Sequence, residues 1–116
     1  MLLKKDLNRK KRIRKVRAKI SGTASKPRLA VFRSLKHIYA QLIDDEHSLT
    51  LVATSDLELK SKKGRRVDQA FEIGQKLANK ATKEKIKEVV FDKRGYKYHG
   101  IVKDLAEGAR KGGLKF

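Results

Sequence analysis

The chain has 116 residues, a formal net charge of +18 and no cysteine. This length suits one small domain with an appendage, and the missing cysteines exclude a disulfide framework, a thiolate metal site and a cysteine nucleophile. The longest apolar run covers residues 29–32, far short of the roughly 20 residues of a membrane span, and the first residues lack the apolar stretch of a secretory signal. We therefore expect a cytoplasmic protein with no membrane partner.

Residues 1–25 are expected to form a basic N-terminal arm and linker. Ten of the first nineteen residues are Lys or Arg and only Asp6 is acidic, so this stretch carries +9. Clustered cations repel one another unless an outside polyanion supplies counter-charge, and the usual polyanion is nucleic acid. A membrane-surface helix would mass aromatic or leucine side chains on one face, and the arm has no aromatic residue. We expect the arm to be helix-prone, disordered when free and folded on RNA; its predicted contacts are Lys4, Arg9, Lys10, Lys11, Arg12, Arg14, Lys15 and Arg17.

The body, residues 26–116, is expected to begin with three antiparallel strands. Residues 29–32 are an apolar run of the kind found in buried strands. Residues 37–43 alternate, with Ile38, Ala40 and Leu42 on one face, and residues 49–54 form a third strand. Short turns at 34–36 and 44–47 imply an antiparallel meander.

Cationic and polar residues bracket the first strand and are predicted to form a rim that contacts phosphate. The alternative interpretation is a set of solvated strand ends. The predicted rim consists of Arg28, Arg33, Ser34, Lys36 and His37.

A charged loop over residues 55–65, which includes the predicted contact Arg65, precedes an amphipathic helix at 66–83. A fourth strand at 88–92 follows this helix, and a helical crossover returns a chain to its sheet in parallel. The last helix spans residues 100–111 and ends at Gly112 and Gly113. The pattern predicts an α/β fold, a mixed four-stranded sheet with flanking helices, in the order α-β-β-β-α-β-α.

The segment from residue 93 to residue 100 combines three cations, two tyrosines, a histidine and two glycines. Glycines allow backbone to approach a ligand closely, amides at a helix N-terminus attract phosphate, and tyrosines stack on exposed bases. The alternative is a plain turn whose tyrosines pack on the sheet edge. The predicted contacts here are Arg94, Gly95, Tyr96, Tyr98 and His99.

No catalytic or metal site is expected. The three histidines are dispersed. Four aspartates near strand ends could in principle hold Mg²⁺ in a two-metal nuclease. We instead expect turn chemistry and solvated loop charge for Asp44 and Asp45, and a helix-entry role for Asp92. No cofactor and no small-molecule substrate are predicted.

Three blocks of sequence closely resemble a known family, the bacterial large-subunit ribosomal protein eighteen. They read KPRLAVFRSLKHIYAQLIDD (residues 26–45), VVFDKRGYKYHG (89–100) and VKDLAEGARKGGLKF (102–116). The family commonly has Phe-Asp-Arg-Gly where this chain has Phe91, Asp92, Lys93 and Arg94. Either Lys93 or Arg94 would therefore take the family arginine's contact.

The resemblance implies a non-enzymatic protein with a fold related to the ribonuclease-H-like group. It would bind 5S rRNA in the central protuberance, next to large-subunit rRNA and the other 5S-binding ribosomal proteins. Two alternatives from other classes are an RNA-processing nuclease on a related fold and a general nucleic-acid condensing protein. Mg²⁺-dependent cleavage would indicate the first, and equal affinity for duplex DNA would indicate the second.

Overall fold

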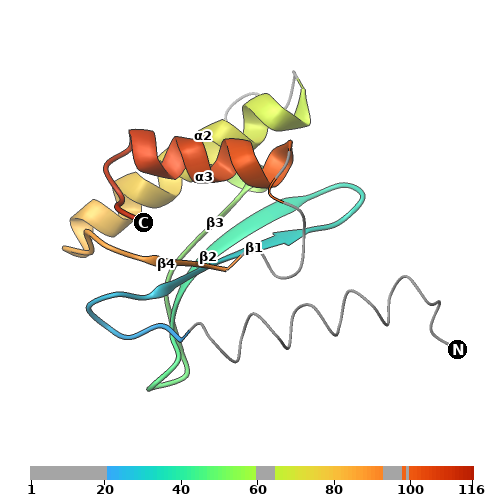
Figure 1. The fold of residues 1–116 in the computed structure, drawn as a ribbon. Helices are drawn as coiled ribbons and strands as arrows, with labels where there is room; N and C mark the ends of the chain where they lie inside the picture. Colours follow the sequence, from blue (N-terminus) through green and yellow to red (C-terminus); the bar gives the residue numbers. More distant parts are fainter. Residues whose placement is uncertain (1–20, 60–64, 93–97, 99) are drawn as a thin grey trace, which may run out of the picture.

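The computed structural model describes residues 21–59, 65–92, 98 and 100–116 (Figure 1). Four strands form one sheet in the order β3-β2-β1-β4. Helices α2 and α3 lie together over one face of that sheet (Figure 1). The predicted α/β fold with a mixed four-stranded sheet is confirmed. The expected helix in residues 1–20 lies outside the described residues, and the ribonuclease-H-like relation stays a prediction.

The strands are β1 (Arg28–Arg33), β2 (Ile38–Asp44), β3 (Leu49–Ser55) and β4 (Val90–Asp92). β1 pairs with β2 and β2 with β3 in antiparallel fashion, so the predicted meander is confirmed. β4 pairs with β1 in parallel, with Leu29 opposite Phe91. The parallel return after a helical crossover is therefore also confirmed, although β4 is shorter than predicted.

The core lies between the sheet and the two helices, α2 (Arg66–Lys83) and α3 (Ile101–Lys111). In β2 the alternating residues Ile38, Ala40 and Leu42 are buried, as the period of two predicts. The buried face of α2 consists of Ala70, Ile73, Gly74, Leu77, Ala78 and Ala81. The predicted helix bounds of 66–83 agree with the structure.

The two helices pack so closely that two glycines lie at their contact. A Cβ added to Gly74 would collide with the backbone oxygen of Leu105, and one added to Gly108 would collide with that of Phe71. α3 then ends in a Schellman motif, in which Gly113 adopts a φ of 113° and the N–H of buried Leu114 donates to the carbonyl of Ala109. Within the described ranges, neither helix is long and apolar enough to cross a membrane.

One element was not predicted, the 3₁₀ helix η1 (Asp56–Glu58) between β3 and α2. Ser55 caps it in a capping box with Glu58. The Glu58 carboxylate also accepts from Lys80 Nζ at 2.6 Å and from the Thr54 hydroxyl. The bond from Lys80, followed by the bond from Thr54, lowers the pKa of Glu58 to about 2. η1 therefore ties the end of β3 to the side of α2.

Candidate nucleic-acid interface

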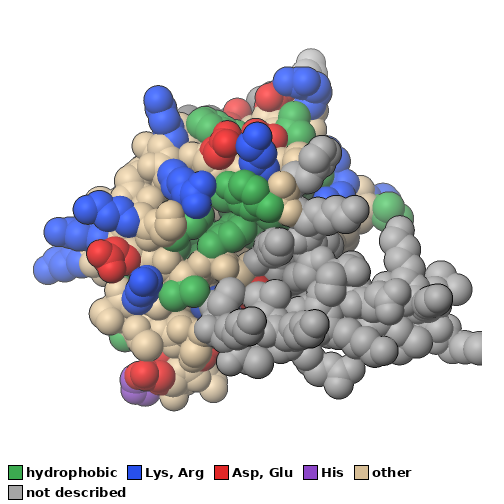
Figure 2. Space-filling view, viewed as in Figure 1, with side chains coloured by type: hydrophobic (Ala, Val, Ile, Leu, Met, Phe, Trp, Pro, Cys, Tyr) green, Lys and Arg blue, Asp and Glu red, His purple; other side chains and the backbone are tan. Residues whose placement is uncertain are grey.

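Positive charge is divided unequally between the described body and the remaining segments. The described residues contain fifteen Lys or Arg and twelve Asp or Glu, a net charge of +3. Segments 1–20, 60–64 and 93–97 contain the other sixteen Lys or Arg and a single acidic residue, Asp6. Figure 2 shows the Lys and Arg side chains of the body scattered over one face among acidic ones. The charge that would bind a polyanion is therefore concentrated in these three segments.

Two of the three cationic segments are attached at one end of the sheet. The β1–β2 turn lies at this end, and β3 finishes there because Ser55 pairs with Tyr39 at the start of β2. β4 runs parallel to β1 and so points toward the same end. α2 and α3 also begin there (Figure 1). Segment 60–64 lies between η1 and the start of α2, and segment 93–97 lies between β4 and the start of α3. Each segment therefore precedes a helix N-terminus, where the helix macrodipole favours anions. We name this region the cationic end.

The β1–β2 turn is fixed to the start of α2 by Arg66. Its guanidinium donates to the carbonyls of Ser34 at 2.8 Å, Leu35 at 3.1 Å and His37 at 3.4 Å. The turn is also closed internally, because the N–H of Ser34 donates to the carbonyl of His37 at 2.9 Å. Sequence reasoning did not single out Arg66, since nothing in the pattern distinguishes it from Arg65.

Five predicted contact residues come together at the cationic end. Arg33 ends β1, Ser34 and Lys36 follow on the β1–β2 turn, and all three are exposed. His37 is half-buried, and its Nδ1 lies 3.3 Å from Asp56 Oδ2. Arg65 precedes α2 and makes an exposed ion pair with Asp68, which is too weak to hold Arg65 in place.

Arg28, in contrast, is not part of an exposed rim. It is only 8% exposed, and its guanidinium lies between two carboxylates. Nε donates to Asp45 Oδ2 at 2.9 Å, Nη2 donates to Asp45 Oδ1 at 3.1 Å, and Nη1 donates to Asp92 Oδ2 at 2.7 Å. The bond to Asp45, opposed by burial and supported by Asp92, raises the pKa of Arg28 above its ordinary value. Because Arg28 is buried, the prediction that it contacts phosphate is corrected. The alternative interpretation of Arg28 as part of a solvated strand end is contradicted as well.

The aspartates have structural positions that the sequence did not reveal. Asp92 is fully buried against Arg28, and α3 begins only at Ile101 with Gly100 as its N-cap, so the predicted helix-entry role of Asp92 is wrong. Asp44 is buried, so the expectation that its carboxylate is a solvated charge in a loop is also wrong. It does serve the expected turn chemistry, because its Oδ1 accepts from the N–H groups of Glu46 and His47.

Asp44 and His47 perturb each other's ionisation. Burial alone would raise the pKa of Asp44, but the side-chain and backbone hydrogen bonds from His47 outweigh it and lower that pKa. The bond between His47 Nδ1 and Asp44 Oδ2, at 2.7 Å, raises the pKa of His47. The ligand atoms of Asp44, Glu46 and His47 lie within 4.8 Å of one another, and the hydrogen bonds from Glu46 and His47 to Asp44 account for this arrangement. Asp45 and Asp92 meet on Arg28, whereas Asp56 contacts His37, so no two-metal carboxylate site forms among the described aspartates.

Tyr98 joins an aromatic cluster beside β4. Its ring meets Phe91 edge-on, with centroids 6.0 Å apart, and Arg110 Nη1 donates to its hydroxyl at 3.1 Å. The Arg110 guanidinium lies 4.4 Å from the ring centroid of Phe116. Tyr98 thus packs on the sheet edge and still remains exposed. Several other predicted contacts lie outside the described residues, namely Arg94, Gly95, Tyr96, His99 and all those of the arm.

Comparison with known proteins gives a consistent result over the whole chain. The family described as "Ribosomal L18 of archaea, bacteria, mitoch. and chloroplast" matches residues 3–116. The chain is 57% identical to a large ribosomal subunit protein uL18 from Chloroherpeton thalassium, over 93% of each chain. It is equally identical to the uL18 of Pelotomaculum thermopropionicum over the full length of both. It is 51% identical to the uL18 of Brachyspira hyodysenteriae, over 93% of this chain and 92% of that one.

Proposed function

This chain belongs to the ribosomal L18 family, and we propose that it binds 5S rRNA and helps attach it to large-subunit rRNA in the central protuberance. It is a structural protein of the large ribosomal subunit, located in the cytoplasmic ribosome, and not an enzyme. The nuclease alternative is therefore excluded. The finer assignment to 5S rRNA rests on the resemblance given above and on the charge distribution.

The single observation that carries the proposal is the division of charge between a near-neutral body and three strongly cationic segments. Structured RNA offers phosphates, 2′-hydroxyls and unstacked loop bases, and its deep major groove is not readable by side chains. Segments rich in Lys and Arg neutralise phosphates, which gives affinity but no specificity for a particular RNA. The ordered body then supplies shape recognition.

The cationic segments leave the body at two opposite ends. Residues 1–20 join it beside the β2–β3 turn, where the N–H of Gly22 donates to Asp45 Oδ2 at 2.7 Å. Segments 60–64 and 93–97 leave from the cationic end. The seven residues of β2 separate the two ends by roughly 20 Å. This separation supports a protein that contacts two regions of RNA at once, as attachment of one rRNA to another requires.

The proposed RNA contacts of the body belong to the cationic end, and Arg28 is left out of them because of its burial. We keep the division into an arm and linker at 1–25 and a single RNA-binding domain at 26–116. The structure adds that the linker is already held by the body from Gly22 onward. Other 5S-binding ribosomal proteins are proposed as neighbours. The proposed contacts are Arg33, Ser34, Lys36, His37, Arg65, Arg94, Gly95, Tyr96, Tyr98 and His99.

A competition assay tests the assignment to 5S rRNA. Labelled 5S rRNA bound to the protein at physiological salt is challenged with unlabelled 5S rRNA, a random RNA of equal length, and duplex DNA. We expect only unlabelled 5S rRNA to compete at low concentration. Equal competition by duplex DNA would contradict the proposal and indicate a general nucleic-acid condensing protein instead.

Tyr96 and Tyr98 are the proposed base readers, and a double substitution to Ala tests them. We expect it to reduce the preference for 5S rRNA over the random RNA, since stacking on aromatic rings is lost. An equal loss of affinity for both RNAs would show that the tyrosines do not read the RNA.

A further inference from the structure

Tyr39 lies on the face of the sheet that points away from the two helices. In β2 every second side chain, beginning with Ile38, enters the core, so Tyr39 and Gln41 point to the opposite face. α2 and α3 lie over the core face of the sheet (Figure 1). The strand register places Phe32 of β1 directly opposite Tyr39. Two half-buried aromatic side chains therefore lie on neighbouring strands of the same face.

Two shallow hollows flank the Tyr39 side chain. One has a volume of about 360 Å³ and lies toward β1, and the other has a volume of about 220 Å³ and lies toward β3. Tyr39 and Gln41 line both hollows, so these two side chains form the wall between them. Small-molecule pockets have volumes of roughly 300–1,000 Å³, so each hollow suits a single planar base better than a larger ligand. The larger hollow is also lined by Phe32, Arg33 and Ser34, and the smaller by Ala53, Thr54, Ser55 and Glu58.

The larger hollow is continuous with the cationic end, because Arg33 and Ser34 belong to both. Of the described residues that line it, only Arg33 is charged, and a cation there favours a chain that carries phosphates. In the smaller hollow the Glu58 carboxylate accepts from Lys80 Nζ at 2.6 Å, which balances its charge. The Gln41 amide can both donate and accept hydrogen bonds, as the edge of a base requires. Aromatic rings, a cation and an amide are the groups with which proteins bind unpaired bases.

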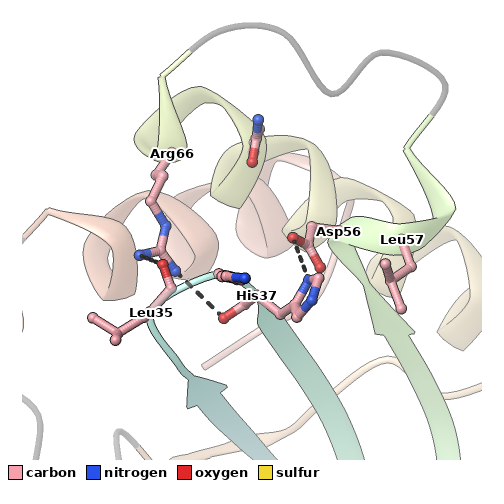
Figure 3. A pocket seen from close by; sticks show the side chains of 7 residues that line it. Leu35, His37, Asp56, Leu57 and Arg66 are labelled. Atoms are coloured by element: carbon pink, nitrogen blue, oxygen red, sulfur yellow. Dashed lines mark hydrogen bonds and ion pairs between the residues drawn. The ribbon is translucent and has the colours of Figure 1, made fainter.

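The Tyr39 ring is held in place before any ligand binds. Its residue is paired on both sides, with Phe32 of β1 and with Ser55 of β3. The centroid of the His37 ring lies 6.1 Å from that of Tyr39, with the ring planes inclined by 58°. Figure 3 shows His37 beside Asp56, and His37 Nδ1 lies 3.3 Å from Asp56 Oδ2. A ring that is already fixed loses little conformational entropy when a base stacks on it.

We propose that Tyr39 stacks on unpaired RNA bases, with one base in each of the two hollows beside it. The Gln41 amide contacts the base edges, and Arg33 contacts a phosphate of the same strand. The occupant is RNA because the larger hollow shares Arg33 and Ser34 with the cationic end. This inference rests on the proposed function, and it adds a stacking surface on the sheet to the phosphate contacts of the cationic segments.

Fluorescence tests the stacking directly, because the chain has no tryptophan. Tyr39→Trp places a single indole ring between the two hollows and keeps an aromatic surface there. We expect 5S rRNA to quench its emission, since a base stacks on the indole. Asn79→Trp is the matched control, because Asn79 is exposed on α2, on the helix side of the molecule. Equal quenching in both variants, or no quenching of Tyr39→Trp at saturating RNA, would overturn the proposal.

Salt dependence distinguishes stacking from phosphate neutralisation. Tyr39→Leu keeps an apolar side chain without the ring, and where the variant is folded its affinity for 5S rRNA should fall about tenfold or more. The slope of log affinity against log salt should stay unchanged for Tyr39→Leu, whereas Arg33→Ala should lower it by roughly 0.7–0.9. Tyr39→Phe should bind like the unsubstituted chain, because its ring remains. Full affinity in Tyr39→Leu, or a slope lowered as in Arg33→Ala, would refute stacking on Tyr39.

A random single-stranded RNA separates this inference from the proposed function. Stacking tolerates any sequence, so this RNA should also quench the emission of Tyr39→Trp, but only at higher concentration than 5S rRNA. Quenching by both RNAs at equal concentration would refute the assignment to 5S rRNA and leave the stacking surface in place. Tight binding of 5S rRNA without quenching would refute the stacking surface and leave the proposed function in place.

Discussion

Replacing Arg28 should destabilise the body strongly and leave RNA affinity unchanged. Its guanidinium bridges Asp45 and the fully buried Asp92, and Asp45 remains partly exposed. Arg28→Ala removes the cation and leaves a carboxylate in the interior. Breaking a buried ion pair from one side costs about 3–5 kcal/mol, whereas the partly exposed half of the bridge adds no more than about 1 kcal/mol.

The expected loss is large for a domain of this size. Native domains are stable by about 5–15 kcal/mol, so Arg28→Ala should lower the free energy of unfolding by roughly a fifth or more. The corresponding fall in melting temperature is roughly 15–30 °C for a domain near 100 residues. Urea unfolding followed by circular dichroism at pH 7 measures the free energy directly, with Arg33→Ala as the control on the same strand. Because Arg33 is exposed, its substitution should change stability by no more than about 0.5 kcal/mol.

A compensating variant checks the physical reason. Arg28→Met combined with Asp92→Leu should recover much of the lost stability, because the cost lies in the buried charge and not in the removed contact. RNA affinity, measured where each variant is folded, should fall for Arg33→Ala and hold for Arg28→Ala. A destabilisation below about 1 kcal/mol for Arg28→Ala, or a double variant as unstable as the sum of its singles, would refute the reasoning.

Three further outcomes are expected from stability measurements. Gly108→Ala should destabilise by about 1–3 kcal/mol, because the added methyl group collides with the backbone of α2; a neutral result in thermal unfolding would contradict the close helix contact. The folded pKa of His47 is raised, so its contribution is fully present below the unfolded pKa and lost as pH rises through the folded one. His47→Gln should therefore destabilise more at pH 6 than at pH 9, and equal losses at both would refute the bond to Asp44. The folded pKa of Glu58 is lowered to about 2, so its stabilisation holds above the unfolded pKa and disappears as pH falls toward 2. Lys80→Met should cost only about 0.5 kcal/mol at pH 6, since the side chains of Lys80 and Glu58 are 38% and 43% exposed, and less at pH 3. A loss that grows on acidification would disprove this.

Hydrophobic periodicity was sufficient to predict the four strands and the two helices α2 and α3 of the body, but not η1. The alternation through β2 and the stripe along α2 depend on local spacing, and both agree with the structure. The capping box from Ser55 to Glu58 is also a local signal and could have revealed η1. Elements that are determined by neighbouring residues can thus be predicted from the sequence.

Long-range pairing explains what the sequence did not show. Arg28 resembles Arg33 in sequence, but its partners lie 17 and 64 positions away, so only the fold distinguishes a buried bridge from an exposed contact. The contacts of Arg66 were missed for the same reason, because its guanidinium donates to backbone carbonyls 29 to 32 positions away. The contacts predicted for the arm and for residues 93–97 stay predictions.

The most direct test is the salt dependence of 5S rRNA binding by the full chain and by a chain that begins at residue 21. Each phosphate neutralised contributes roughly 0.7–0.9 to the slope of log affinity against log salt. We predict that removing residues 1–20 weakens binding and lowers that slope by several units, while the shortened chain still folds and still prefers 5S rRNA to duplex DNA. An unchanged slope would contradict the claim that the arm neutralises RNA phosphates. A preference for 5S rRNA that disappears together with the arm would contradict the claim that the body recognises the RNA.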